Sequence, residues 1–323
     1  MRLTPFLVAS FLAALLTGPA ARAATYLLPG GSDTVVGELQ RVLAQHEDTL
    51  LDIGRRYGVG YDEIVAANPG VDPWLPGAGR EVLIPSRYIL PNAPREGIVV
   101  SLAEHRVYYF PPTKAGEPAV VKTYPISIGK MDWKTPLGIT RIVNKRANPA
   151  WYPPESVRRE HEAEGRPMPQ VVPPGPDNPL GQHAMRLGIP GGAYLIHGTN
   201  RPAGVGMQIT HGCIRMFPED IAELYALVPV NTIVRMIDQP YKMGWRGEEL
   251  FIEVHTPLEG GAEPEAHSLT NITRLLVSAT NERSVAIDWA AAEQAFLHAT
   301  GVPEPVVLRT PTQLQVSAET TGL

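Results

Sequence analysis

The stretch YLIHGTNRPAGVGMQITHGCIRM, residues 194–216, holds the only cysteine among the 323 residues of the chain. His211 stands two positions before Cys213, Arg215 stands two positions after it, and His197 ends a short apolar run earlier in the stretch. A thiol attacks carbonyl groups as the thiolate, which a nearby base or positive charge favours. A lone cysteine can also be a buried inert residue or form an intermolecular disulfide. Because these polar neighbours are poor lining for an apolar core, they favour a reactive thiol.

The residues around Cys213 supply what carbonyl chemistry needs. Gly212 permits a sharp turn and the close approach of a substrate, and the amides of Gly212 and Cys213 can stabilise the oxyanion of a tetrahedral intermediate. If residues 211–213 are extended, His211 and Cys213 point to the same face. His197 can reach the thiol only through the fold. Arg215 suits a substrate carboxylate or a structural acidic partner.

A zinc site is the main alternative for the same side chains. His197, His211 and Cys213 could form a three-ligand site with an open position for water. The sequence has no C-x-x-C or H-E-x-x-H pattern that would support such a site. Imidazole and thiol groups also serve nucleophilic catalysis. The spacing favours catalysis over zinc binding but does not exclude zinc.

Residues 1–23 have the features of a secretory signal peptide. Arg2 precedes the apolar run 6–16, and Ala21-Arg22-Ala23 fits an A-x-A cleavage site. The apolar run is too short to span a bilayer, and we expect no membrane span later in the chain. Export leads to an oxidising compartment, where structural cysteines normally come in pairs. A single cysteine there has no disulfide partner within the chain.

Composition limits the partners and the fold class. The net charge is −5 and no cluster of Lys and Arg stands out, so we expect no nucleic-acid partner. The 33 prolines and 7% aromatic residues favour a loop-rich, largely β protein. Short β-branched or aromatic runs separated by turn residues predict a β-sandwich or barrel. These runs lie at 97–102, 105–110, 119–129, 138–143, 193–198 and 232–237, with a hairpin turn at 102–105.

A proline-rich stretch interrupts this pattern at residues 148–179. A long structureless insertion in a compact domain is usually a functional lid or a disordered segment. Trp151 and Tyr152, at its start, would either anchor it on a substrate groove or pin it to the core.

The N-terminal part, residues 35–88, has a different pattern. It indicates helices at 50–57 and 61–67 and a strand at 81–85, with Gly58 suited to the left-handed end of the first helix. The pattern resembles a LysM module, a small βααβ fold that binds glycans containing N-acetylglucosamine. The usual Gly-Asp-Thr-Leu appears here as EDTL (47–50), so the glycine of the turn into the helix is missing. A module that only supports its neighbour is the alternative.

The C-terminal part, residues 239–323, contains one or two further strands around 247–258 and an alanine-rich helix around 285–300. We find no residues there that indicate chemistry.

The quoted stretch closely resembles the active-site signature of L,D-transpeptidases with a YkuD-type catalytic domain. His197 precedes Cys213 by sixteen residues, and THGCIR (210–215) matches the rest of the signature. Residues 35–255 resemble the Gram-negative periplasmic group that carries an N-terminal LysM, known as ErfK/YbiS/YcfS/YnhG. The resemblance implies a mainly β protein with a LysM module at 35–88, a β-sandwich catalytic domain at 96–238 and a mixed extension of unknown role at 239–323. It also implies a periplasmic location.

The resemblance also implies roles for individual residues. Cys213 would be the nucleophile and His197 its general base, oriented by the backbone carbonyl of Gly198. His211 and Gly212 would shape the pocket and the oxyanion site. The expected substrate-binding residues are Thr210, Arg215, Asn200 and Arg201.

The implied reaction is acyl transfer on peptidoglycan tetrapeptide stems, through a thioester on Cys213 and with release of D-alanine. The acceptor would be a second stem, giving a 3-3 cross-link, or the C-terminal lysine of an outer-membrane lipoprotein. Water as acceptor would make the protein an L,D-carboxypeptidase. Glycan strands would bind the LysM module, and no cofactor or metal is expected. A peptidoglycan-binding protein without activity is the other alternative, although such a protein would normally have lost Cys213 or His197.

Overall fold

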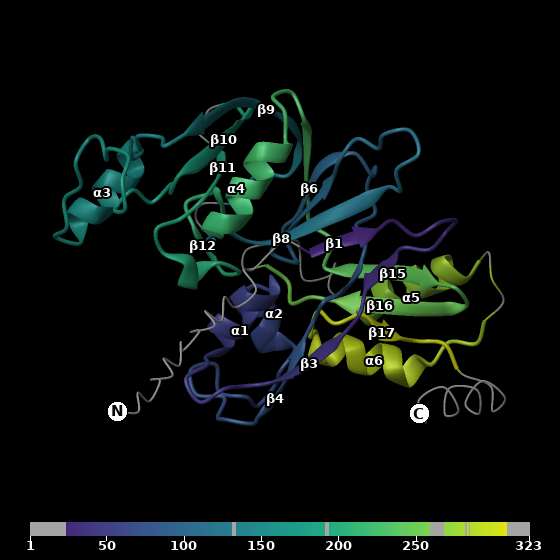
Figure 1. Ribbon diagram of the computed structural model, residues 1–323. Coiled ribbons are helices and arrows are strands. Elements are labelled where there is room, and N and C mark those ends of the chain that lie inside the picture. The colour runs from purple at the N-terminus through teal and green to yellow at the C-terminus, as the bar shows by residue number, and fades with distance from the viewer. Residues whose placement is uncertain are drawn as a thin grey trace, which may run out of the picture.

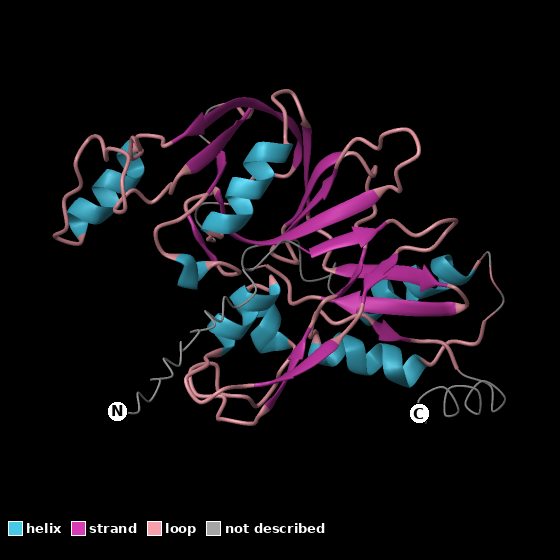
Figure 2. Ribbon diagram, viewed as in Figure 1, coloured by secondary structure: helices cyan, strands magenta, loops and turns pink. Residues whose placement is uncertain are grey.

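A computed structural model describes residues 24–130, 134–190, 194–258, 268–281, 283 and 285–308. The expected signal peptide at 1–23 lies outside the described residues. The protein is mostly β, as predicted, with its strands gathered in one large sheet and several smaller ones (Figure 2). In the described part of the chain, no helix has the length and apolar character needed to cross a membrane.

The large sheet has ten strands, and the strands of the C-terminal part form a separate sheet (Figure 1). The ten strands are β1 (Ala24–Leu27), β6 (Gly97–Ser101), β7 (Arg106–Phe110), β8 (Val120–Gly129), β9 (Gly138–Ala147), β10 (His183–Leu187), β11 (Leu195–His197), β12 (Gln208–Thr210), β13 (Ile214–Met216) and β14 (Ile233–Ile237).

Two long strands, β8 and β9, divide this sheet into two halves. The first part of β8 pairs with β1 and β7, and its last part pairs with β13 and β12. Likewise, β9 pairs first with β14 and then with β10. Each strand therefore passes from one half-sheet to the other, which gives the two-layered arrangement expected of a sandwich.

One core lies between the half-sheets. Ile98, Val100 and Val234 enter it from the first half, and Ile196 and Ile214 enter it from the second. Helix α4 (Pro218–Leu227) packs beside β10 and adds its own apolar side chains to this core. The outer face of the first half is covered by other parts of the chain, whereas the outer face of the second half carries the candidate site.

The N-terminal module has the predicted order of strand, two helices and strand. These elements are β3 (Gln40–Leu43), α1 (Leu50–Tyr57), α2 (Tyr61–Ala66) and β4 (Glu81–Ile84), and β3 pairs with β4. Gly58 ends α1 in the left-handed conformation, as predicted. Thr49 caps α1 through a capping box, and the carboxylate of Asp48 accepts a hydrogen bond from the Gln45 amide at 2.8 Å. The turn into the helix therefore forms without the missing glycine.

A second ribbon links this module to the rest of the protein. It consists of β2 (Val35–Gly37) and β5 (Arg87–Ile89), which pair with each other. Val36, Tyr88 and Leu90 pack on the outer face of the first half-sheet, against Tyr108 and Phe110.

The start of α2 contacts the loop that precedes β12. The amide of Tyr61 donates to the Val205 carbonyl at 3.1 Å, and the amide of Asp62 donates to the Gly206 carbonyl at 3.2 Å. Gly206 has φ of +94°, and a Cβ at this position would lie 2.2 Å from the Tyr61 nitrogen. The module therefore packs backbone to backbone against the segment between His197 and Cys213.

The C-terminal part is a small mixed unit. It contains β15 (Tyr241–Arg246), β16 (Glu249–Val254) and β17 (Glu304–Pro305), with α5 (Leu269–Thr280) and α6 (Trp289–His298) packed on the sheet. The ammonium group of Lys242 lies 2.9 Å from a carboxylate oxygen of Glu104 and 2.7 Å from one of Glu253. These buried charges join the C-terminal unit to the turn between β6 and β7.

Several predictions from sequence need correction. The insertion 148–179 is not structureless, because it contains α3 (Glu155–Ala163) and a bridge between Trp151 and Val172. Strand β9 is four residues longer than expected, ending at Ala147 rather than at 143. Patterning did not predict several elements, among them β1, β10, β12, β13, β15, α4 and α5.

A buried ion pair between α2 and β7 gives a test of how the module is held. Arg106 Nη2 lies 2.5 Å from Glu63 Oε2, and the two side chains are 1% and 9% exposed. The variant Glu63→Gln leaves the Arg106 charge without its counterion, which should lower the free energy of unfolding by about 3–5 kcal/mol. Urea denaturation would measure the loss.

The matched control is Glu81→Gln, which removes the exposed pair between Arg41 and Glu81. This change should cost about 0–1 kcal/mol. Equal small losses in the two variants would contradict the importance of the buried pair.

Candidate functional site

The site is built on two neighbouring parallel strands. In the register of β11 and β13, Ile196 is opposite Ile214 and His197 is opposite Arg215. The two isoleucines point into the core, so the alternation of a strand places His197 and Arg215 on the outer face. Cys213 comes directly before β13, and the backbone of Leu195 hydrogen bonds to its thiol.

His197 is held in one orientation. Its side chain is buried, and Nδ1 lies 2.6 Å from the carbonyl oxygen of Gly198. Since a carbonyl oxygen only accepts, Nδ1 carries the proton and Nε2 remains a proton acceptor. Burial, together with the charge of Arg215, lowers the pKa of His197 to about 3, against the opposing effect of the Gly198 contact. The imidazole is therefore neutral at physiological pH.

The Cys213 thiol is also neutral at rest. Burial raises its pKa above the ordinary value of 9.0, and the Leu195 backbone and the Arg215 charge only partly oppose this effect. A neutral thiol and a neutral imidazole differ from a preformed thiolate–imidazolium pair. Nucleophilic attack in this site therefore has to be coupled to proton transfer from sulfur to a base.

Hydrogen bonds fix the backbone on both sides of Cys213. The hydroxyl of Thr135 donates to the Gly212 carbonyl at 3.1 Å, and that of Thr210 donates to the Cys213 carbonyl at 2.6 Å. In a trans peptide the N–H points away from the C=O, so holding the Gly212 carbonyl also sets the direction of the Cys213 amide. Thr210 is buried and its hydroxyl positions the backbone, while its contact with substrate stays a prediction.

Residues 211–213 are not extended. The expectation that His211 and Cys213 point to the same face depended on an extended backbone, so it does not apply. Gly212 has φ of +92° and lies between β12 and β13. His211 Nε2 lies 2.6 Å from a carboxylate oxygen of Glu160 in α3, and Lys130 binds the other oxygen at 2.7 Å. The Lys130 contact and then the His211 contact lower the pKa of Glu160 to about 2. The insertion thus reaches the residue next to Gly212.

The remaining expected residues lie around the same face. Asn200 and Arg201 are exposed on the loop after β11. Arg215 is partly buried and, within the described residues, forms no ion pair, and burial lowers its pKa. The Cys213 thiol opposes this effect, whereas the Arg201 charge adds to it, so the two guanidinium groups are close enough to influence each other.

The geometry does not support the alternative of a zinc site. Within the described residues, ligand atoms close enough to share an ion occur at Glu104, Glu253 and His255. His197, His211 and Cys213 do not form such a group. At the group that does, the Lys242 ammonium already lies between the two carboxylates.

Comparison with known proteins agrees with this geometry. Residues 95–236 match the L,D-transpeptidase catalytic domain (YkuD). The chain is 43% identical over 254 residues to the probable L,D-transpeptidase YcfS of Escherichia coli K12, covering 77% of this chain and 78% of YcfS. The chain belongs to the L,D-transpeptidase family. Members of this family are acyltransferases.

Two further L,D-transpeptidases cover most of the chain. The probable L,D-transpeptidase YbiS of E. coli K12 is 37% identical over 288 residues, which are 88% of this chain and 92% of YbiS. The probable L,D-transpeptidase ErfK/SrfK of Salmonella typhimurium is 39% identical over 261 residues, which are 80% of this chain and 81% of that relative.

Three residues that contribute to the site were not predicted from the sequence. Thr135, Lys130 and Glu160 lie far from Cys213 in sequence and reach it through the fold. Threonine, lysine and glutamate are common surface residues, so their type gave no signal. The proline-rich insertion that carries Glu160 was the one hint.

The neutral state of the site can be tested by alkylation of Cys213 with iodoacetamide. Because the pKa of Cys213 is raised, the thiolate fraction should rise about tenfold per pH unit through neutral pH and continue to rise above pH 9. His197, with a pKa of about 3, should add no step between pH 5 and 8. Mass spectrometry of the labelled protein gives the rate, and Cys213→Ala supplies the blank. A plateau already reached near pH 7 would indicate a preformed ion pair and contradict the expectation.

Proposed function

We propose that the protein is a peptidoglycan L,D-transpeptidase with Cys213 as nucleophile and His197 as general base. The observation that supports the proposal is the pairing of β11 with β13, which sets His197 opposite Arg215, two residues after Cys213, while His197 Nδ1 lies 2.6 Å from the Gly198 carbonyl oxygen. The family supplies the reaction class, and the site supplies the groups that such a reaction needs.

In the acylation step, His197 Nε2 takes the thiol proton as sulfur attacks the carbonyl at the L-centre of diaminopimelate in a tetrapeptide stem. The oxyanion that forms accepts a hydrogen bond from the Cys213 amide, whose direction Thr135 fixes through Gly212. Collapse of the intermediate breaks the bond to D-alanine, and His197 returns the proton to the leaving amine. A thioester on Cys213 remains.

In the second step an amine attacks the thioester and His197 takes its proton, which returns to sulfur as the thiolate leaves. Diaminopimelate of a second stem as acceptor gives a 3-3 cross-link. The C-terminal lysine of an outer-membrane lipoprotein as acceptor attaches that protein to the wall. Water as acceptor gives L,D-carboxypeptidase activity. Every bond exchanged is an acyl bond, so the scheme calls for neither redox change nor energy input.

Positive charge beside the thiol suits the end of the substrate. Arg215 forms no ion pair within the described residues and lies next to Cys213, with Arg201 nearby. A carboxylate such as that of the terminal D-alanine would satisfy these guanidinium groups. Asn200, exposed on the same loop, is a further candidate for substrate contact.

The insertion 148–179 would act as a lid over the bound stem. Its helix α3 is fastened to the site by the contacts of Glu160 with His211 and Lys130, all three of which are partly exposed. These ion pairs can break and re-form at modest cost, since ion pairs near the surface contribute about 0–1 kcal/mol.

We place the protein in the periplasm, delivered by the signal peptide at 1–23.

The reaction can be tested by incubating the purified protein with tetrapeptide muropeptides and analysing the products by mass spectrometry. We expect release of D-alanine together with dimers or tripeptides. Cys213→Ala and His197→Gln should each lower the rate by about a thousandfold or more.

His298→Gln, which changes an exposed histidine in α6, is the matched control and should leave the rate unchanged. Dimers as the main product would identify an amine acceptor, and tripeptides would identify water. Turnover that survives in Cys213→Ala would overturn the proposed nucleophile.

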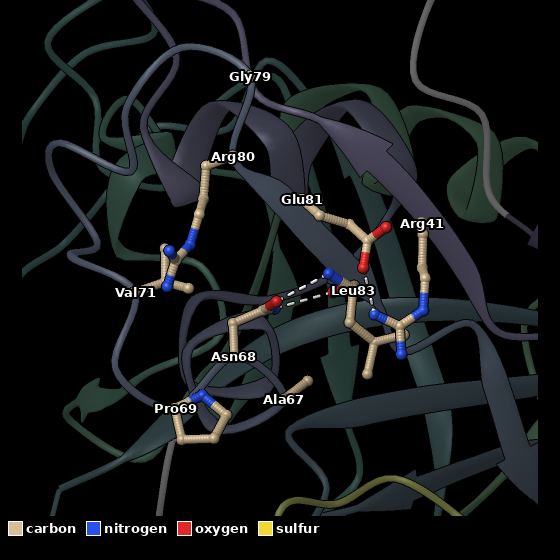
Figure 3. A pocket seen from close by; sticks show the side chains of 9 residues that line it. All are labelled: Arg41, Ala67, Asn68, Pro69, Val71, Gly79, Arg80, Glu81 and Leu83. Carbon is tan, nitrogen blue, oxygen red and sulfur yellow. Dashed lines mark hydrogen bonds and ion pairs between the residues drawn. The ribbon is translucent and has the colours of Figure 1, made fainter.

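The βααβ module would hold glycan strands near the catalytic face. A hollow of about 510 Å³ lies at the end of α2, lined by Asn68, Arg80 and Arg41 among others (Figure 3). The Asn68 side chain is held in this hollow by the Leu83 backbone. Its Nδ2 donates to the Leu83 carbonyl at 2.8 Å, and its Oδ1 accepts from the Leu83 amide at 2.7 Å. On the same α2–β4 loop, Trp74 is 59% exposed, which leaves an aromatic ring available to stack on a sugar.

Glycan binding can be measured by retention of the Cys213→Ala protein on insoluble peptidoglycan. Adding Trp74→Ala should weaken retention about five- to tenfold, since one aromatic contact contributes about 1 kcal/mol. Leu27→Ala, at an apolar residue of β1 that is also well exposed, is the control. Equal retention of both variants would favour a module that only supports its neighbour.

A further inference from the structure

A second hollow lies beside the catalytic residues, on the outer face of β9, β10 and β11. It has a volume of about 430 Å³, and its lining includes Arg146, Arg186, Ala184 and Leu195. We call it the β9–β11 groove. We infer that this groove binds a carboxylate of the peptide that is attacked by Cys213, through Arg186 and Arg146. This inference rests on the proposed function and specifies how the donor peptide is recognised.

Strand registers place the groove in line with the catalytic residues. Arg186 is opposite Leu195 in the pairing of β10 with β11, and Leu195 in turn lies beside Cys213. In the next row, Ala184 is opposite both Arg146 and His197. The groove therefore begins at Leu195 and Ala184, the neighbours of Cys213 and His197, and runs across the sheet toward the two arginines.

The two faces of these strands are clearly distinguished. Met185 and Ile196, opposite each other, are fully buried in the core. Alternation along the strands then places Arg186, Ala184 and Leu195 on the opposite face.

Both arginines are exposed and available to a ligand. Within the described residues, neither Arg146 nor Arg186 forms an ion pair or a side-chain hydrogen bond with a protein group, and no acidic side chain lines the groove. Asn144, opposite Arg186 on β9, adds an amide to the same lining. Planar guanidinium groups without a protein carboxylate are well suited to bind one from a ligand.

The spacing fits a carboxylate within the same peptide. Arg186 is two strands from the strand that follows Cys213, which is roughly 10 Å at about 4.8 Å per strand. An extended peptide covers about 3.3–3.6 Å per residue. The carboxylate bound by Arg186 therefore lies within about three residues of the attacked carbonyl. In a tetrapeptide stem this includes backbone and side-chain carboxylates, which are chemically alike and have to be distinguished by experiment.

The insertion completes the groove. Pro149 and Ala150, at its start, and Leu180, directly after its end, form part of the lining. A peptide in the groove would therefore lie between the sheet and the segment that carries Glu160, which is fastened to His211. Substrate recognition and the position of the insertion are thereby linked through one surface.

The test measures binding and acylation separately. Binding of tetrapeptide stems is measured calorimetrically in the Cys213→Ala background, and acylation of protein with intact Cys213 is followed by mass spectrometry. Arg186→Gln should weaken binding about tenfold, as expected for the loss of one charge-assisted contact. The acylation rate at saturating stem should be unchanged. Arg186→Lys should recover part of the affinity.

Stems with each carboxylate amidated in turn identify the bound group. Amidation of that group should weaken binding to the protein with intact arginines about tenfold and should have little further effect in Arg146→Gln/Arg186→Gln. Arg141→Gln, at an exposed arginine of β9 outside the groove, is the matched control and should bind normally.

Equal affinity of Arg186→Gln, Arg146→Gln/Arg186→Gln and Arg141→Gln would overturn the inference while leaving the proposed reaction in place. The same holds if every amidated stem loses affinity equally in all variants. Failure of the protein with intact Cys213 to form an acyl-enzyme with any stem would contradict the proposed function and this inference with it.

Discussion

The site depends on the parallel pairing of two three-residue strands. Strands β11 and β13 bring His197 opposite Arg215, two residues after Cys213. In the sequence, sixteen positions separate His197 from Cys213. Strands β10 and β8 pair on either side and anchor both in the large sheet. The pair is thus positioned by main-chain hydrogen bonds and by isoleucines in the core. The loop between β11 and β12 therefore does not have to set the relative positions of His197 and Cys213. This loop is itself held by the hydrogen bond from the Asp62 amide of α2 to the Gly206 carbonyl.

Charged side chains follow two different rules in this protein. Away from the site, buried charges are matched, as with Arg106 and Glu63 or Lys242 between two carboxylates. Such matching is required because an isolated charge is costly to bury. On the outer face of β9 to β13, three arginines have no carboxylate among the described residues: Arg215, Arg186 and Arg146. The anionic peptide proposed as substrate would supply negative charge to these arginines.

Sequence reasoning succeeded where structure is encoded locally. Runs of β-branched residues gave β6, β7, β8 and β14 within a residue or so, and Gly58 marked the end of α1. It failed where tertiary contacts decide the outcome. Strand β10 has mixed polarity because one face contacts solvent and the other the core. The conformation at Gly212 and the reach of Thr135 and Glu160 likewise depend on distant segments.

The buried ammonium of Lys242 bears on where the chain can be divided. The part that matches the catalytic family ends at residue 236, yet Glu104, within that part, faces Lys242 just beyond the boundary. Tyr108 donates its hydroxyl proton to the same carboxylate. A fragment cut at residue 236 would lose Lys242 and leave the buried Glu104 carboxylate without its cation. A fragment that keeps this ion pair therefore extends at least through β15, which carries Lys242, and through β16 if the second carboxylate, that of Glu253, is kept as well.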